Sequence, residues 1–121
     1  MTDLKIKELD TKYGRIFSRD ALIIRDYSIQ LKPMVVNIKA SLSLRGCIPS
    51  VKDVPDVSVE FYFNDVENVS IYRVDDFPYE KYTLSSLDEV EGEYKRNRKR
   101  IILSTYDHVF DIIGNLELKY K

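Results

Sequence analysis

We predict a single all-β domain over residues 1–121, mostly antiparallel, that forms a β-sandwich or a partly open barrel with at most one short helix. Two segments alternate apolar and polar residues with the period of two that marks a half-buried strand. Nine tyrosines and many valines and isoleucines suit a pleated sheet better than a helix. Glycine, proline and asparagine interrupt the chain at short intervals, which is typical of many short strands.

The alternation is clearest at residues 36–44 and 57–63. Weaker strand patterns occupy residues 4–8, 21–31, 69–74, 90–94, 101–106, 109–113 and 116–120. Turn signals at Asn64-Asp65, near Asn97 and at Gly114-Asn115 predict that the chain reverses there. Residues 83–90 have two interpretations: a short helical turn, where a serine precedes Asp88 and Glu89, or an acidic run that leads straight into a strand.

Charge and cysteine content limit the classes of function. The chain has 19 basic and 20 acidic residues and a net charge of −1, so it lacks the basic excess of general nucleic-acid binders. Its single cysteine, Cys47, cannot form an internal disulfide, which predicts a reducing, cytoplasmic location. No apolar run has the length of a signal peptide or a membrane span.

Catalytic and metal-binding signals are sparse. His108 is the only histidine, and on a strand it would point away from its neighbour Asp107, so an enzyme that uses His108 is the last alternative. Arg45 stands two residues before Cys47 and could lower a thiol pKa, but a buried, inert cysteine is the commoner case. Motifs for phosphate, zinc or calcium binding are absent, so we expect no cofactor and no metal.

The candidate surface for a protein partner is an acidic stretch that carries several aromatic residues. Tyrosine is enriched at protein interfaces, and carboxylates attract basic partners. The expected contact residues are Tyr62, Asp65, Glu67, Tyr72, Asp75, Asp76 and Tyr79.

A basic cluster provides the alternative of nucleic-acid binding. It consists of Lys95, Arg96, Arg98, Lys99 and Arg100. Three glutamates precede it, and a hairpin that turns near Asn97 would set the acidic and basic arms opposite each other. The charges would then serve the fold and not a ligand.

Residues 57–71, Val-Ser-Val-Glu-Phe-Tyr-Phe-Asn-Asp-Val-Glu-Asn-Val-Ser-Ile, resemble the central hairpin of small β-rich immunity proteins from bacterial polymorphic toxin systems. The resemblance implies a non-enzymatic protein inside a bacterial cell that binds a cognate toxin and blocks its active site. The acidic, aromatic stretch favours a basic toxin domain as that partner. We therefore expect a protein-binding domain, either an immunity protein or another inhibitor, that does not bind a membrane. Exposed strand edges could pair two copies of the chain into a homodimer.

Overall fold

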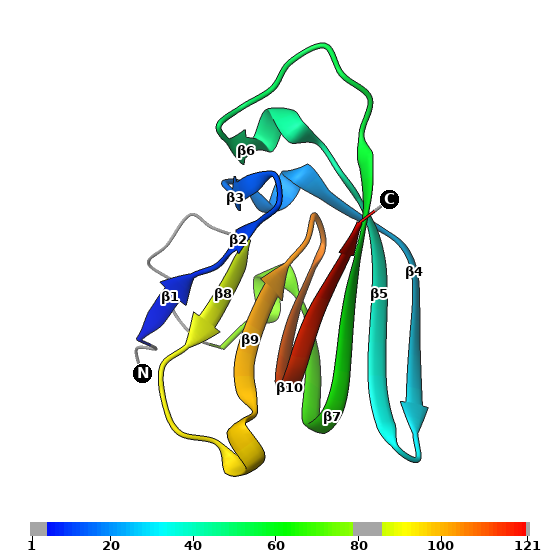
Figure 1. The fold of residues 1–121 in the computed structure, drawn as a ribbon, viewed down its shortest axis with the longest axis vertical. Helices are drawn as coiled ribbons and strands as arrows, with labels where there is room; N and C mark the ends of the chain where they lie inside the picture. Colours follow the sequence, from blue (N-terminus) through cyan, green and yellow to red (C-terminus); the bar gives the residue numbers. More distant parts are fainter. Residues whose placement is uncertain (1–4, 79–85, 121) are drawn as a thin grey trace.

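The computed structural model describes residues 5–78 and 86–120 and confirms the all-β prediction. All strand pairs are antiparallel, and the main sheet has seven strands in the order β1-β8-β9-β10-β7-β5-β4 (Figure 1). Its two outer strands, β1 and β4, do not pair with each other, so the sheet stays open. The strands are β1 (Ile6–Glu8), β4 (Leu22–Leu31), β5 (Met34–Leu42), β7 (Val57–Arg73), β8 (Leu87–Val90), β9 (Lys99–Ser104) and β10 (His108–Tyr120).

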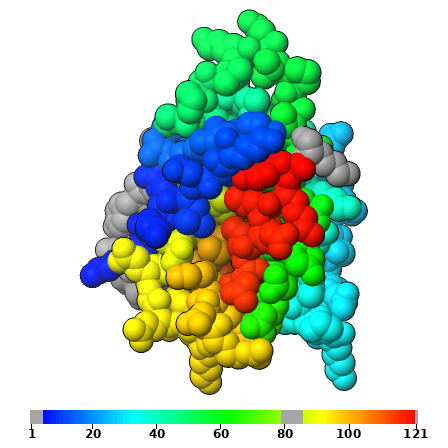
Figure 2. Space-filling view, viewed as in Figure 1, coloured from blue at the N-terminus to red at the C-terminus, as the bar shows by residue number. Residues whose placement is uncertain are grey.

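A second sheet of three short strands covers one end of the first. It has the order β2-β3-β6, from Asp10–Thr11, Gly14–Ile16 and Cys47–Ile48. The backbone N–H of Lys12 donates to the Tyr120 hydroxyl at 2.8 Å, and the Tyr13 and Tyr120 rings meet edge to face at 5.6 Å. In the space-filling view this blue segment lies against the red end of β10 (Figure 2). The C-terminal strand therefore anchors the small sheet.

Helical structure in the described residues is limited to four 3-10 turns of three residues each. They are η1 (Arg19–Ala21), η2 (Leu44–Gly46), η3 (Val74–Asp76) and η4 (Lys95–Asn97). None of these segments has the length and apolar character needed to cross a bilayer.

The main sheet consists of two halves that share the long β7–β10 ribbon. At one end of the ribbon, the N-terminal part of β7 (residues 57–63) lies between β5 and the C-terminal part of β10, which gives a four-strand half. At the other end of the ribbon, the N-terminal part of β10 pairs with β9. Strand β9 pairs in turn with β8, and β8 with β1, which gives a five-strand half. In the described chain, the second part of β7 has β10 as its only neighbour.

The two halves meet at a bulge in the ribbon. The register shifts between Ile113 and Asn115, and Asp65 opposite has a positive φ of 49°. Gly114 fits there because an added Cβ would lie 3.1 Å from the Asn64 carbonyl oxygen and 3.1 Å from a methyl group of Val66. A bulge of this kind bends both strands and increases their twist.

The bend encloses one hydrophobic core. The four-strand half contributes Val36, Ile38 and Phe61, and the five-strand half contributes Leu103 and Ile112, all at most 1% exposed. Ile16 and Cys47 of the small sheet belong to the same cluster. A smaller cluster, which includes Val90, Ile102 and Val109, lies elsewhere in the five-strand half.

Two local predictions are wrong. The turns expected at Asn64-Asp65 and Gly114-Asn115 are the two sides of the bulge, so residues 57–73 and 108–120 each form one strand and not two. Of the two alternatives for residues 83–90 the structure has the strand, from Leu87 onwards and paired with β9; residues 83–85 lie outside the described residues. The chain does reverse near Asn97, where Arg96 and Asn97 both have positive φ.

The bulge generates a testable prediction for Gly114→Ala. The new methyl group would press against the Asn64 carbonyl and Val66, and overpacking of this kind costs about 1–3 kcal/mol. We expect urea unfolding to show that loss in the free energy of unfolding. Ser58→Ala, at an exposed position of the same ribbon, is the control and should change it little. Equal stability of the two variants would contradict the role assigned to Gly114.

Candidate functional site

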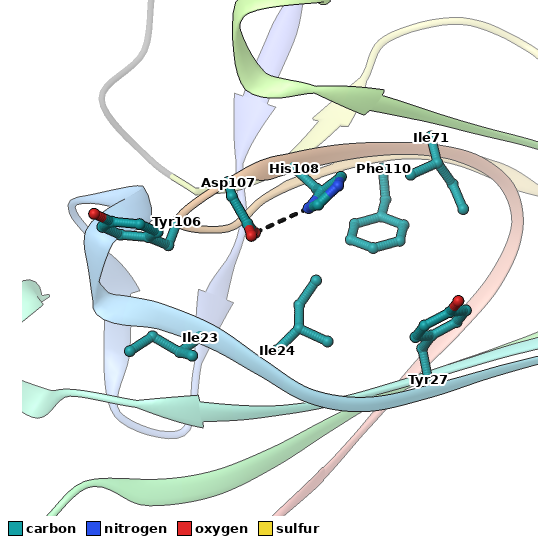
Figure 3. A pocket seen from close by; sticks show the side chains of 8 residues that line it. All are labelled: Ile23, Ile24, Tyr27, Ile71, Tyr106, Asp107, His108 and Phe110. Carbon is teal, nitrogen blue, oxygen red and sulfur yellow. Dashed lines mark ion pairs between the residues drawn. The ribbon is translucent and has the colours of Figure 1, made fainter.

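An apolar cleft of about 370 Å³ lies between β4, the C-terminal end of β7 and the N-terminal end of β10. Ile24 and Tyr27 extend from β4 toward Phe110 and Ile71 on the opposite wall (Figure 3). Phe110 is buried, whereas Ile71 is 44% and Tyr27 62% exposed, so the cleft has a packed floor and open walls. Ile23 also contributes to the lining.

The cleft follows from the bend in the sheet. Because β5 pairs only with residues 57–63 of β7, no described strand fills the space between β4 and the second part of β7. One contact brings the two sides together at one end, where the Tyr106 N–H donates to the Leu22 carbonyl at 2.9 Å. The cleft therefore lies where the main sheet remains open.

A polar hollow of about 750 Å³ adjoins the cleft and shares Tyr106, Asp107 and His108 with it. Aspartates outnumber arginines in its lining by four to two, so the hollow presents an excess of negative charge. The remaining lining residues are Arg19, Asp20, Arg73, Val74, Asp75 and Asp76.

His108 stands at the junction of the cleft and the hollow. Its Nδ1 lies 2.9 Å from a carboxylate oxygen of Asp107 (Figure 3), an ion pair when the imidazole is protonated. The expectation that these neighbours point apart is wrong, because Asp107 precedes the first residue of β10 and does not follow the alternation of a strand. His108 is thus held at the mouth of both openings.

The predicted acidic and aromatic residues divide among different surroundings. Asp75 and Asp76 lie together in the wall of the hollow. Asp65 and Glu67 are at the bulge, where Arg98 binds both at 3.0 and 2.9 Å. The Tyr62 ring has the Lys119 Nζ above it at 4.3 Å, Tyr72 meets Phe77 edge to face at 5.4 Å, and Tyr79 lies outside the described residues.

Most of the predicted basic cluster is committed to carboxylates of this chain. Arg98, with a side chain only 11% exposed, also donates from Nε to the Asp65 carbonyl at 2.7 Å. Arg96 lies 3.5 Å from Asp65, and Lys99 lies 3.6 Å from Glu89. Of these contacts only that of Lys99 joins the two arms of the hairpin, and the partners of Arg96 and Arg98 come from β7.

Arg100 has a partner that sequence reasoning missed. Its Nε and Nη2 donate to the two oxygens of Asp111 at 2.9 and 2.6 Å, a bidentate ion pair that is largely buried. The signal in the sequence was a lone carboxylate within the apolar run 109–113. Of the basic cluster, Lys95 is exposed on η4, and Arg96 and Lys99 also keep exposed side chains.

Cys47 lies in the hydrophobic core, and its Sγ is 3.9 Å from the Ser43 carbonyl oxygen. Burial raises the pKa of the Cys47 thiol above its usual value, so the thiolate is disfavoured. Arg45 does not activate it, because Arg45 is an exposed residue of η2 and the resulting shift is upward.

Within residues 5–78 and 86–120, no group of three or more histidine, cysteine, aspartate or glutamate side chains has the arrangement of a metal site. Comparison of the chain with models of protein families, with curated protein sequences and with solved structures finds no significant match. The geometry of the cleft and the hollow is therefore the basis for any functional assignment.

Sequence reasoning missed the apolar cleft. Its principal residues, Ile24, Tyr27, Ile71 and Phe110, come from three segments separated by more than 30 positions, so no local pattern joins them. A signal was present in residues 21–31, where apolar and polar residues do not keep a strict period of two. That irregularity corresponds to the β4 bulge between Ile24 and Asp26.

The buried ion pair predicts that Arg100 acts in folding. Arg100→Gln would leave the Asp111 carboxylate without its guanidinium group in a largely buried site, and breaking such a pair costs about 3–5 kcal/mol. Thermal unfolding followed by circular dichroism should show a large fall in the midpoint. Lys95→Gln, an exposed member of the same cluster, should leave the midpoint unchanged, and equal effects would contradict this assignment.

Burial of Cys47 predicts an unreactive thiol. At pH 8 the native protein should react with a coloured disulfide reagent much more slowly than the same protein in denaturant, because both access and thiolate formation are suppressed. A variant with Cys47→Ser and Ser50→Cys carries an exposed thiol instead and should react at once. Rapid reaction of native Cys47 would show that the core opens easily.

Proposed function

We propose that this chain is a non-enzymatic protein-binding module that holds one basic protein partner at the apolar cleft and the adjoining acidic hollow. The observation that carries the proposal is their continuity: an apolar cavity with partly exposed walls runs into a hollow rich in aspartate through Tyr106, Asp107 and His108. A desolvated apolar anchor beside a polar rim is the usual composition of a binding hot spot.

The cleft suits an apolar side chain of the partner. Its volume falls within the roughly 300–1,000 Å³ typical of binding pockets, and Ile24, Ile71 and Phe110 offer an apolar lining. The exposed areas of Ile71 and Tyr27 lose contact with water when such an anchor enters. This apolar contact supplies affinity.

The hollow favours a partner with lysine or arginine next to the anchor. Asp20, Asp75, Asp76 and Asp107 exceed the two arginines of the lining, so a cationic group of the partner is attracted and an acidic one repelled. Arg19 and Arg73 limit how many cations the hollow takes. Charge complementarity selects basic partners over acidic ones and raises the rate of association.

Within this class we propose an inhibitor of the immunity-protein kind, which neutralises a toxin or enzyme inside the cell by covering its active site. The likeness of residues 57–71 to immunity proteins supports it, as does the preference of the hollow for a basic surface. Asp75 and Asp76 are the predicted contact residues that line the hollow.

The two alternatives receive less support. Nucleic-acid binding through residues 95–100 is weakened because Arg98 and Arg100 already bind carboxylates of this chain, and the acidic hollow repels phosphate. Catalysis by His108 is weakened because, among the described residues, none that lines the cleft or the hollow is a serine, threonine or cysteine for it to activate.

The proposal predicts which substitutions abolish capture of the partner. Tagged protein is used to recover the partner from a lysate of its own host, with nuclease added, and bound proteins are identified by mass spectrometry. Ile71→Asp should abolish capture by placing a charge in the apolar wall, and the pair Asp75→Lys and Asp76→Lys should weaken it at least about tenfold. Both variants should keep the thermal midpoint of the unmodified chain.

Matched controls separate the site from general surface effects. Val54→Asp alters an apolar residue whose exposure, 45%, is close to that of Ile71, but which does not line the cleft. Glu91→Lys with Glu93→Lys reverses two exposed carboxylates outside the hollow. If these controls reduce capture as much as the site variants, or if recovery depends on nucleic acid, the proposed site is wrong.

A further inference from the structure

The outer edge strand β4 carries three exposed apolar side chains at alternate positions near its end. In register with β5, Tyr27, Ile29 and Leu31 stand opposite Ile38, Val36 and Met34, so they occupy the face of the sheet that forms the core. Yet these three side chains are 62%, 38% and 72% exposed.

Sheet edges in monomers are commonly protected by lysine, proline, a bulge or a covering segment. The bulge of β4 lies between Ile24 and Asp26, and the strand that follows it up to Leu31 contains no lysine, arginine or proline. No other described strand pairs with this edge. Apart from the Tyr27 N–H, which donates to an Asp26 carboxylate oxygen at 2.9 Å, the edge therefore offers backbone groups that no described strand pairs, beside exposed apolar side chains.

We propose that β4 pairs with β4 of a second copy of this chain, antiparallel and with Ile29 on the two-fold axis. The pairing joins two seven-stranded sheets edge to edge into one continuous sheet. It goes beyond the proposed function and does not depend on it, because the ladder is argued from the β4 edge alone, although Tyr27 of that edge also lines the cleft.

The position of the axis follows from the sequence of the strand. An axis at Asp26 would oppose two carboxylates, which destabilises a ladder. An axis at Tyr27 or Ser28 would bring the irregular Arg25 position into the new ladder. An axis at Ile29 uses only the regular strand beyond the bulge.

This register is chemically self-complementary. Opposed residues of an antiparallel ladder lie on the same face, so with Ile29 on the axis apolar side chains meet on one face and polar ones on the other. The opposed pairs are Tyr27 with Leu31, Ser28 with Gln30, and Ile29 with its own copy. At each end Asp26 comes opposite Lys32 of the second copy, which adds two favourable charge contacts.

The dimer should be in equilibrium with the monomer. Edge pairing over about five residues per copy buries less than the roughly 1,600 Å² of a standard stable interface. The two copies also bring their exposed Tyr27, Ile29 and Leu31 together on the core face. We therefore expect a dimer that forms as concentration rises and dissociates on dilution.

Sedimentation equilibrium of the whole chain tests the dimer. The weight-average mass should rise toward twice that of the chain over a concentration series from micromolar to millimolar. Ile29→Lys should remain monomeric with unchanged circular dichroism, because it places a charge at the axis. Ile23→Lys, at an exposed position of β4 opposite Ser41 and outside the new ladder, should associate like the unmodified chain. A monomer at every concentration, or equal loss in both variants, would overturn the proposal.

Disulfide trapping tests the register. Ile29→Cys should form an intermolecular disulfide under mild oxidation, because the two positions face each other across the axis. Leu31→Cys should not, since the two copies of that position would lie roughly 13 Å apart, four strand residues along the ladder. The mixture of Tyr27→Cys with Leu31→Cys should yield heterodimers. Leu31 is the more exposed position, so collision alone would favour its linkage, and faster linkage at Leu31 than at Ile29 would exclude this register. Cys47 is buried in all variants.

Discussion

The structure depends on the bulge that bends the β7–β10 ribbon. The bend turns the two halves of the sheet toward each other, so that their apolar side chains share one core. The positive φ of Asp65 and the missing side chain of Gly114 create the bend, and Arg98 stabilises it through one carbonyl and two carboxylates. The four-strand half then packs against the five-strand half around a common core.

Strand positions were largely predictable because the period of two depends on local residues. The alternation at residues 36–44 and 57–63 corresponds to β5 and the first part of β7. The difference between a turn and a bulge was not predictable, because Asn-Asp and Gly-Asn favour both. The outcome at Asp65 depends on Arg98, 33 positions away, and on the approach of Gly114 to Asn64.

The charged residues show the same limit of local reasoning. Asp65 and Glu67 were assigned to a partner, and Arg98 to nucleic acid, yet these residues bind one another in the fold. Each group was identified correctly as charged, but its use was decided by a contact between distant segments. Asp75 and Asp76 differ because they line an open hollow, which leaves their charge available to a partner.

The incomplete closure of the sheet gives rise to both proposed binding surfaces. In the described chain β4 is the edge strand beside β5, and because β7 turns away from β5 at the bulge, the inner side of β4 becomes a wall of the cleft. Its outer edge remains free to pair with a second copy. Tyr27 belongs to the cleft wall and also lies within the self-complementary stretch. A dimer would therefore fix the position of that wall, so that association of two copies and capture of a protein partner are coupled through one side chain.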